Sequence, residues 1–150
     1  MKLLGNVVSC HGIKANPKKI EAVTKMKPPT CVKDVQKLTG CMAALSRFIS
    51  QLGEKGLPFF KLLKASGKFI GTPEAMKAFD ELKQFLTMPL VMTAPQPGES
   101  LLVYITVTNR VVSTTILIER EEAGHAYKVQ RPVYFISKVL NKSKAWYPQV

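Results

Sequence analysis

A chain of 150 residues, 46% of them hydrophobic, can bury a core, so a disordered polypeptide is not the expectation. Its 22 basic and 10 acidic residues give a formal net charge of +12, which favours polyanionic partners such as nucleic acid or an acidic membrane surface. No apolar run approaches the roughly 18 residues of a membrane span, so we expect a soluble intracellular protein, cytoplasmic or nuclear, with no membrane partner.

The first predicted elements are a short strand and a short helix. Residues 3–9 form an apolar strand candidate, and residues 10–12 have the composition of a turn that reverses it. Asn16 followed by Pro17 then provides an N-cap and a first helical position. Pro28 and the proline after it end this helix.

The most strongly periodic segment follows directly. Thr30 can cap a long helix in which apolar residues recur every three or four positions over residues 32–52. Gly53 and Gly56 are predicted to end that helix, because glycine favours helix C-termini. A further short helix is predicted to begin near Pro58.

The last helix and the strands complete the predicted fold. Thr72 and Pro73 begin a helix whose predicted buried stripe consists of Met76, Phe79, Leu82, Phe85 and Leu86. Residues 89–100 contain three prolines and are predicted to form an extended connector. Strands are predicted at residues 101–108, 112–119 and 132–137. The fold class is therefore α+β, with a helical bundle followed by an antiparallel or mixed sheet.

The long helix carries a second stripe beside its apolar one. Small and hydrogen-bonding residues lie together on this stripe: Gln36, Gly40, Ala43, Ala44 and Arg47. A glycine in mid-helix costs about 1 kcal/mol relative to alanine, so something is expected to approach the backbone closely there. The spacing alone favours another packed helix over the alternative, the minor groove of a nucleic-acid duplex.

Lysines are concentrated before and within the same helix. Lys33 and Lys37 lie in its first turns, and five more lysines lie between residues 14 and 27. Such a run is usually a solvated face, but lysines that meet phosphates make binding depend steeply on salt. A polyanion is therefore expected to bind the first half of the chain.

No other cluster of residues points to a catalytic or metal site. Cys10, Cys31 and Cys41 lack the close spacing of zinc ligands and are predicted to be reduced thiols. The two histidines have no nucleophile or carboxylate at a suitable spacing, and the three glutamates near residue 120 fit a charged hairpin tip better than a metal site. No metal site is predicted.

Several phrases of the sequence, taken in order, resemble the Pol polyprotein of gypsy-class LTR retrotransposons (Metaviridae) along essentially the whole chain. These phrases are LLGNVVSCHGIKANPKKIEAV, MKPPTCVKDVQKLTGCMAALSRFI, LPFFKLLKA, AFDELKQFLTMP and QRPVYFISKVLNKSKAWYPQ. The resemblance implies a fragment with three parts. Residues 1–13 would end the reverse transcriptase palm with a primer-grip-like hairpin, residues 14–87 would form the helical thumb, and residues 88–150 would form a truncated RNase H-like domain.

The resemblance also implies roles for particular residues. The thumb helix of this family follows the minor groove of the template-primer duplex, and Gln36, Gly40 and Arg47 match its positions, which raises the groove interpretation above helix packing. Ala44 stands where several relatives carry a large aromatic residue, so the grip is expected to be weaker. The primer-grip-like hairpin would comprise Leu4, Gly5, Asn6, Val7, Val8 and Ser9.

By the same resemblance, the chain is expected to lack catalytic activity on its own. Thr106 stands where the family's RNase H strand carries an aspartate that helps to bind two magnesium ions, and a neutral hydroxyl cannot replace that carboxylate. No cofactor is therefore expected. The expected function is binding of primer-template, either an RNA-DNA hybrid or a DNA duplex, alongside the remainder of the Pol polyprotein. Two alternatives stay open, an inert transposon relic and, less favoured, residual RNase H activity.

Overall fold

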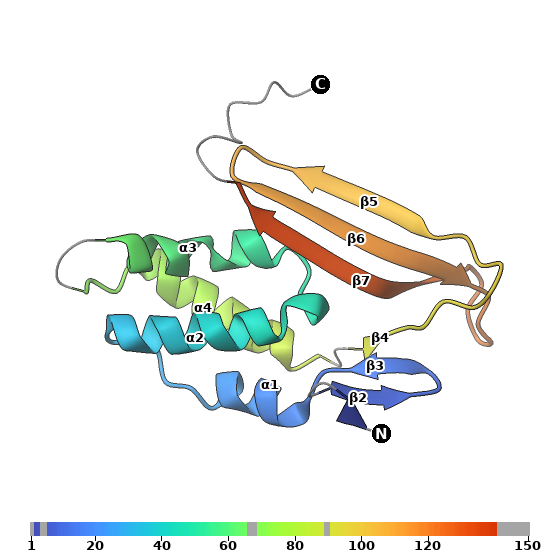
Figure 1. Ribbon diagram of the computed structural model, residues 1–150, viewed down its shortest axis with the longest axis horizontal. Coiled ribbons are helices and arrows are strands. Elements are labelled where there is room, and N and C mark those ends of the chain that lie inside the picture. The colour runs from blue at the N-terminus through green and yellow to red at the C-terminus, as the bar shows by residue number, and fades with distance from the viewer. Residues whose placement is uncertain (1, 4–5, 66–68, 89–90, 141–150) are drawn as a thin grey trace.

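The computed structural model describes residues 2–3, 6–65, 69–88 and 91–140, and it combines a set of helices with two open antiparallel sheets (Figure 1). This arrangement confirms the predicted α+β class. The elements, in chain order, are β1 (Lys2–Leu3), β2 (Asn6–Ser9), β3 (Gly12–Lys14), α1 (Pro17–Thr24), α2 (Val32–Ala44), the 3-10 helix η1 (Ser46–Phe48), α3 (Leu52–Lys64), α4 (Pro73–Leu86), β4 (Val91–Met92), β5 (Leu102–Val107), β6 (Val111–Arg120) and β7 (Val129–Val139).

Two of the three predicted helix N-caps are confirmed. The Asn16 side chain accepts a hydrogen bond from the backbone N–H of Lys18 at 3.0 Å, and the Thr72 hydroxyl accepts one from Ala75 at 3.2 Å. The prediction for α2 was wrong, because Cys31 rather than Thr30 occupies the N-cap. Thr30 instead donates from its backbone N–H and from its hydroxyl to the Asp34 carboxylate, both at 3.0 Å.

The long helix predicted over residues 32–52 is interrupted. Helix α2 ends at Ala44, the chain turns through η1, and Ile49 is extended. Gly53 and Gly56 therefore do not end a helix but lie buried in the first turns of α3, which begins at Leu52 and contains Pro58. The spacing of apolar residues predicted a continuous helix here. The prediction was wrong because η1 contacts β7, and tertiary contacts override local helical spacing.

The first sheet joins the two ends of the helical segment. Its strand order is β1-β2-β3-β4, so β4, from the segment predicted to be only an extended connector, pairs antiparallel with β3 through Ile13 and Met92. Gly12 begins β3 with φ at +131°, and a Cβ placed on it would lie 1.9 Å from the Met92 carbonyl oxygen. This close approach requires glycine at the turn.

The second sheet has the order β5-β6-β7, with β5 at an edge. Of the three strands in this sheet, β7 lies nearest to the helices, and both η1 and α3 contact it (Figure 1). The backbone N–H of Gly53 donates to the Ser137 hydroxyl at 2.9 Å, and that hydroxyl lies 2.8 Å from the hydroxyl of Ser113. Helix α3 is thus attached to β6 and β7 by a small, partly buried polar group as well as by packing.

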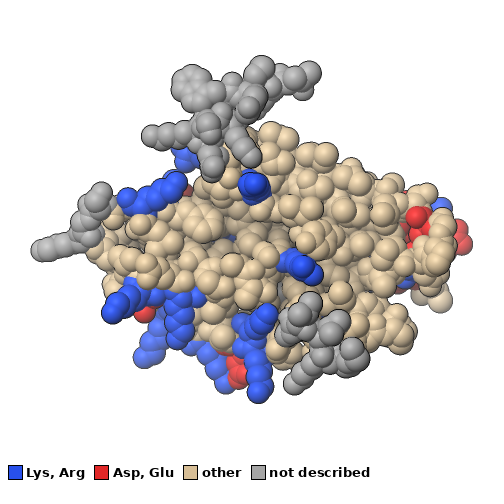
Figure 2. Space-filling model, in the orientation of Figure 1, with Lys and Arg blue, Asp and Glu red and all other residues tan. Residues whose placement is uncertain are grey.

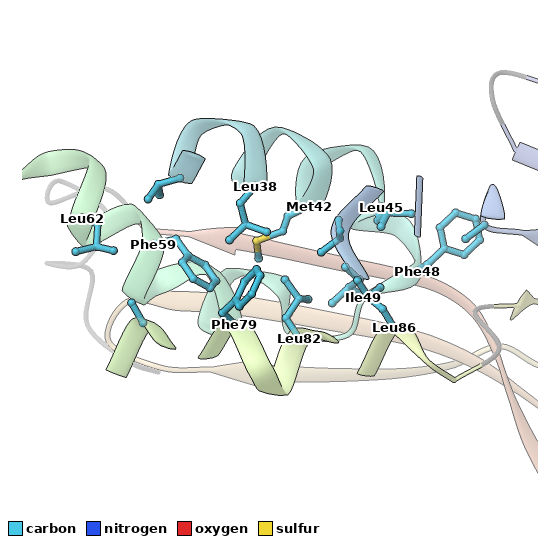
Figure 3. Close-up of a cluster of buried hydrophobic side chains, with 14 of the residues drawn as sticks. Leu38, Met42, Leu45, Phe48, Ile49, Phe59, Leu62, Phe79, Leu82 and Leu86 are labelled. Carbon is cyan, nitrogen blue, oxygen red and sulfur yellow. The ribbon is translucent and has the colours of Figure 1, made fainter. Parts of the chain in front are cut away.

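The main core lies between α2, α3 and α4, whose buried side chains point toward one another (Figure 3). Leu38, Phe59, Phe79 and Leu82 are at most 1% exposed and form its centre. The predicted stripe of α4 is confirmed at Phe79, Leu82 and Leu86, but Met76 is 38% exposed, and Ala75 is buried in its place. Within the described residues, no helix is both long enough and apolar enough to cross a membrane.

Candidate nucleic-acid interface

The second stripe of α2 lies on the surface. Gln36, Gly40 and Ala44 are exposed, whereas Val35 and Leu38 on the opposite side are completely buried. Apart from its chain neighbours and the nearby backbone of its own helix, a Cβ placed on Gly40 would meet no atom of the described residues within 4 Å. The spacing alone favoured packing of a second helix against Gly40. For the described residues that interpretation is wrong. The stripe presents exposed backbone and small side chains to any partner that can reach it.

Positive charge borders this stripe. Lys33 and Lys37 are both exposed, and they lie one turn apart in α2, so they follow the same side of the helix. Basic side chains gather along the edge of the molecule formed by α1 and α2, with few acidic ones among them (Figure 2). The pKa of Asp34 is lowered, chiefly by the hydrogen bond from the Thr30 backbone N–H, so this carboxylate is already engaged by the start of its own helix.

The hairpin that the resemblance relates to a primer grip is formed by β2 and β3. Asn6, Val7 and Val8 are half-buried and Ser9 is exposed, while the predicted members Leu4 and Gly5 lie outside the described residues. Val8 pairs with Ile13, and the Ser9 hydroxyl donates to the carbonyl of Gly12 at 3.2 Å. The hairpin is thus closed at its turn by side-chain and backbone hydrogen bonds.

A small cavity brings the hairpin, the end of the stripe and the second sheet together. The cavity is about 50 Å³ and is lined by Asn6, Arg47 and Tyr134, with Phe48 beside them. The Arg47 Cζ lies 5.8 Å from the centre of the Tyr134 ring. The structure therefore brings two of the predicted binding elements, β2 and the Arg47 end of the stripe, to one place. The contact with Tyr134 was not predicted.

A larger cavity that sequence reasoning missed lies beside the hairpin turn. It measures about 880 Å³, and its walls include Lys14, Arg120 and Arg131. Arg120 donates two hydrogen bonds to Glu99, one of them at 2.8 Å, and Arg131 donates at 2.8 and 2.6 Å to Glu122. The side-chain hydrogen bond from Arg120 lowers the pKa of Glu99 to about 2. The first pair joins the segment before β5 to the end of β6, and the second joins the segment after β6 to β7.

Thr106 lies on the edge strand β5, where it is exposed and faces Ser113 of β6. Its neighbours on the strand are also uncharged, and the described part of the chain holds no group of three His, Cys, Asp or Glu residues that could bind a metal ion. Magnesium favours carboxylate ligands, so the hydroxyl of Thr106 does not fit the two-magnesium site that the resemblance would imply here. Cys10, Cys31 and Cys41 are free thiols, as predicted.

The comparisons with known proteins confirm the resemblance to Pol polyproteins. No protein-family model matches the chain. The chain is 24% identical over 161 residues to the retrovirus-related Pol polyprotein from transposon opus of Drosophila melanogaster, covering 100% of the chain and 16% of that protein. It is 26% identical over 149 residues to the retrovirus-related Pol polyprotein from transposon 297 of the same organism, and this match covers 98% of the chain and 13% of that protein. The chain therefore spans less than a fifth of the curated relatives it matches.

A solved structure shares the fold. The foamy viral protease-reverse transcriptase in complex with an RNA/DNA hybrid matches with a TM-score of 0.72 and 16% sequence identity, over 99% of this chain and 19% of that one. The same viral protein in complex with double-stranded DNA matches with the same score. At this identity the likeness concerns the fold, which is that of part of a reverse transcriptase.

Proposed function

We propose that this chain, whose relatives are retrovirus-related Pol polyproteins, binds the primer-template duplex through the exposed stripe of α2 and η1. The observation that carries the proposal is the open space beside Gly40, on a helix whose opposite face is buried in the core. A minor groove accepts such a surface because it excludes bulky side chains and offers acceptors to amide and guanidinium donors. Gln36 and Arg47 supply these donors on either side of the glycine.

The charged and hairpin residues have supporting roles. Lys33 and Lys37 are exposed beside the stripe and would neutralise phosphates on the strands that border the groove. The described hairpin residues, Asn6 to Ser9, would lie along the primer strand. Phosphate contacts of this kind position a duplex without reading its sequence, so RNA-DNA hybrids and DNA duplexes of any sequence are the expected ligands.

We further propose that the chain performs no catalysis on its own. The reason is chemical: Thr106 offers a neutral hydroxyl where a carboxylate would have to balance a divalent cation. The remainder of a Pol polyprotein is the proposed partner, because the curated relatives are several times longer than this chain. In that setting the chain would hold the duplex while other segments act on it.

The first test is the salt dependence of binding. The affinity of the full chain for a fluorescent 20-base-pair RNA-DNA hybrid is measured by anisotropy at several salt concentrations. Each lysine that meets a phosphate should contribute a slope of about −0.9 in log affinity against log salt for duplex DNA. Affinity that does not change with salt would contradict the proposal.

The second test separates groove contact from general positive charge. Gly40→Leu keeps the charge but fills the open space, and it should weaken binding about ten-fold, the loss of one groove contact worth about 1.4 kcal/mol. Lys37→Ala should instead make the salt slope shallower by nearly one unit. Lys77→Ala is the matched control, because Lys77 on α4 is 78% exposed and lies outside the stripe. Equal effects of the two lysine substitutions would contradict the proposed location.

A further inference from the structure

We infer that Tyr134 is a positioning residue for duplex binding: its ring holds the Arg47 guanidinium in place at the end of the α2 stripe. This inference rests on the proposed function. It also assigns the second sheet a direct part in the grip, because Tyr134 belongs to β7, whereas the predicted nucleic-acid contacts all lie on the hairpin, α2 and η1.

Arg47 differs from the rest of the stripe in its backbone. Helix α2 ends at Ala44, and Arg47 lies in η1, so helical geometry does not hold it in line with Gln36 and Gly40. Its neighbours Leu45 and Phe48 are at most 3% exposed and anchor the turn in the core. The side chain of Arg47 itself is exposed and long, so without a support it would lose much rotational freedom on binding.

Tyr134 provides such a support. It lies within β7, paired with Ile116 of β6, and the next residue, Phe135, packs against the main core. The ring is therefore carried by a strand that pairs with β6 and packs against the main core through the next residue. The distance of 5.8 Å from Arg47 Cζ to the ring centre is within the range at which a guanidinium is attracted to an aromatic face.

The same place also holds the one buried polar side-chain atom of the described residues that has no hydrogen-bond partner, the Oδ1 of Asn6. Asn6 lines the small cavity together with Arg47 and Tyr134. A buried acceptor without a donor is costly, so a donor that arrives here is stabilised. The guanidinium of Arg47 lines this cavity without donating to that oxygen, and it lies over the Tyr134 ring instead. The ring contact is therefore the one that the structure gives the guanidinium beside the hairpin.

The test is a double-mutant cycle on the full chain with the 20-base-pair RNA-DNA hybrid as the probe. Tyr134→Leu should weaken binding about two- to five-fold, the range expected for one exposed cation-ring contact. Tyr134→Phe keeps the ring and should bind as the unmodified chain does. In an Arg47→Ala background, Tyr134→Leu should cause no further loss, because the ring acts only through the guanidinium. Additive losses would overturn the inference.

Arg47→Lys tests the same idea without altering the sheet. Lysine keeps the charge but lacks the planar group that stacks on a ring, so affinity should fall about two- to five-fold while the salt slope stays unchanged. Binding of this variant equal to that of the unmodified chain would mean that charge alone matters at this position, and the inference would fail. If Tyr134→Leu does not fold, unchanged binding of Arg47→Lys still overturns the inference.

A readout on the free protein separates this inference from the proposed function. The NMR signals of the Arg47 side chain should show the shift caused by an adjacent ring, and Tyr134→Leu should abolish that shift, whereas Tyr127→Leu, at a tyrosine that is 87% exposed, should not. If Arg47→Ala weakens duplex binding and Tyr134→Leu does not, the inference fails and the proposed function stands. If the unmodified chain binds no duplex, both fail.

Discussion

Two glycines on consecutive helices should respond to alanine in opposite ways. Gly40 lies in the middle of α2, and beyond its chain neighbours and the nearby helix backbone no described atom lies within 4 Å of an added Cβ, so Gly40→Ala gains helix propensity without a clash. The gain is about 0.8 to 1 kcal/mol in the free energy of unfolding. For a chain of this size, that corresponds to a rise in melting temperature of about 2 to 4 °C.

Gly53→Ala meets a different surrounding. Its added Cβ would lie 2.7 Å from the Val111 Cγ1 and 2.8 Å from the Ser137 Oγ, both on the second sheet. Neither side chain is long enough to move away, and Ser137 is also held by its contact with Ser113. Overpacking costs about 1 to 3 kcal/mol, which exceeds the small propensity gain in a first helical turn. The two variants should therefore differ by about 2 to 4 kcal/mol in stability.

Urea unfolding followed by circular dichroism measures both free energies, provided that the dependence on denaturant is the same in each variant. The expected order of stability is Gly40→Ala, then the unmodified chain, then Gly53→Ala. A loss of stability in Gly40→Ala would mean that part of the chain covers this glycine. The exposed-stripe interpretation, and the proposed interface with it, would then be contradicted.

Three further predictions concern single carboxylates or their absence. The pKa of Glu99 is lowered from an ordinary 4.5 to about 2, so its pair with Arg120 stabilises the fold above pH 4.5, and this stabilisation is lost as the pH falls toward 2. Glu99→Gln removes this contribution, so acid unfolding in that pH range, followed by fluorescence, should become less steep. Asp34→Asn should lower the melting temperature, because a charged acceptor for Thr30 at the start of α2 is removed, and an unchanged value would contradict this role. Thr106→Asp should leave an RNA-DNA hybrid uncut in magnesium, since one added carboxylate does not complete a two-ion site; chelator-sensitive cleavage by this variant would contradict that reasoning, and the same cleavage by the unmodified chain would contradict the proposal that it performs no catalysis on its own.

Local signals in the sequence predicted those parts of the fold that local interactions determine. The caps at Asn16 and Thr72 form within three residues of the chain, and both are present. The end of α2 was missed because Leu45, Phe48 and Ile49 continue a helical apolar period although the backbone turns. These residues are buried in the core although the helix is interrupted, so hydrophobic spacing alone does not reveal the turn.

The candidate site divides in the same way. The stripe around Gly40 follows from helical spacing, and the structure brings it to the surface. Tyr134 and Arg120 gave no signal, because their partners Arg47 and Glu99 are distant in sequence and meet only after the strands pair. An arginine at a stripe end and an aromatic residue on a later strand are common in any sequence, so their meeting depends on the tertiary fold.

The central claim is that a nucleic-acid duplex lies against the exposed side of α2, and mapping of amide NMR shifts during titration with the RNA-DNA hybrid tests it most directly. The account predicts that the amide signals of Gln36 and Gly40 and the side-chain signal of Arg47 shift together with increasing duplex, while those of Met76 on α4 and Val103 on β5 stay in place. Shifts confined to α4 or β5, with α2 unchanged, would contradict it.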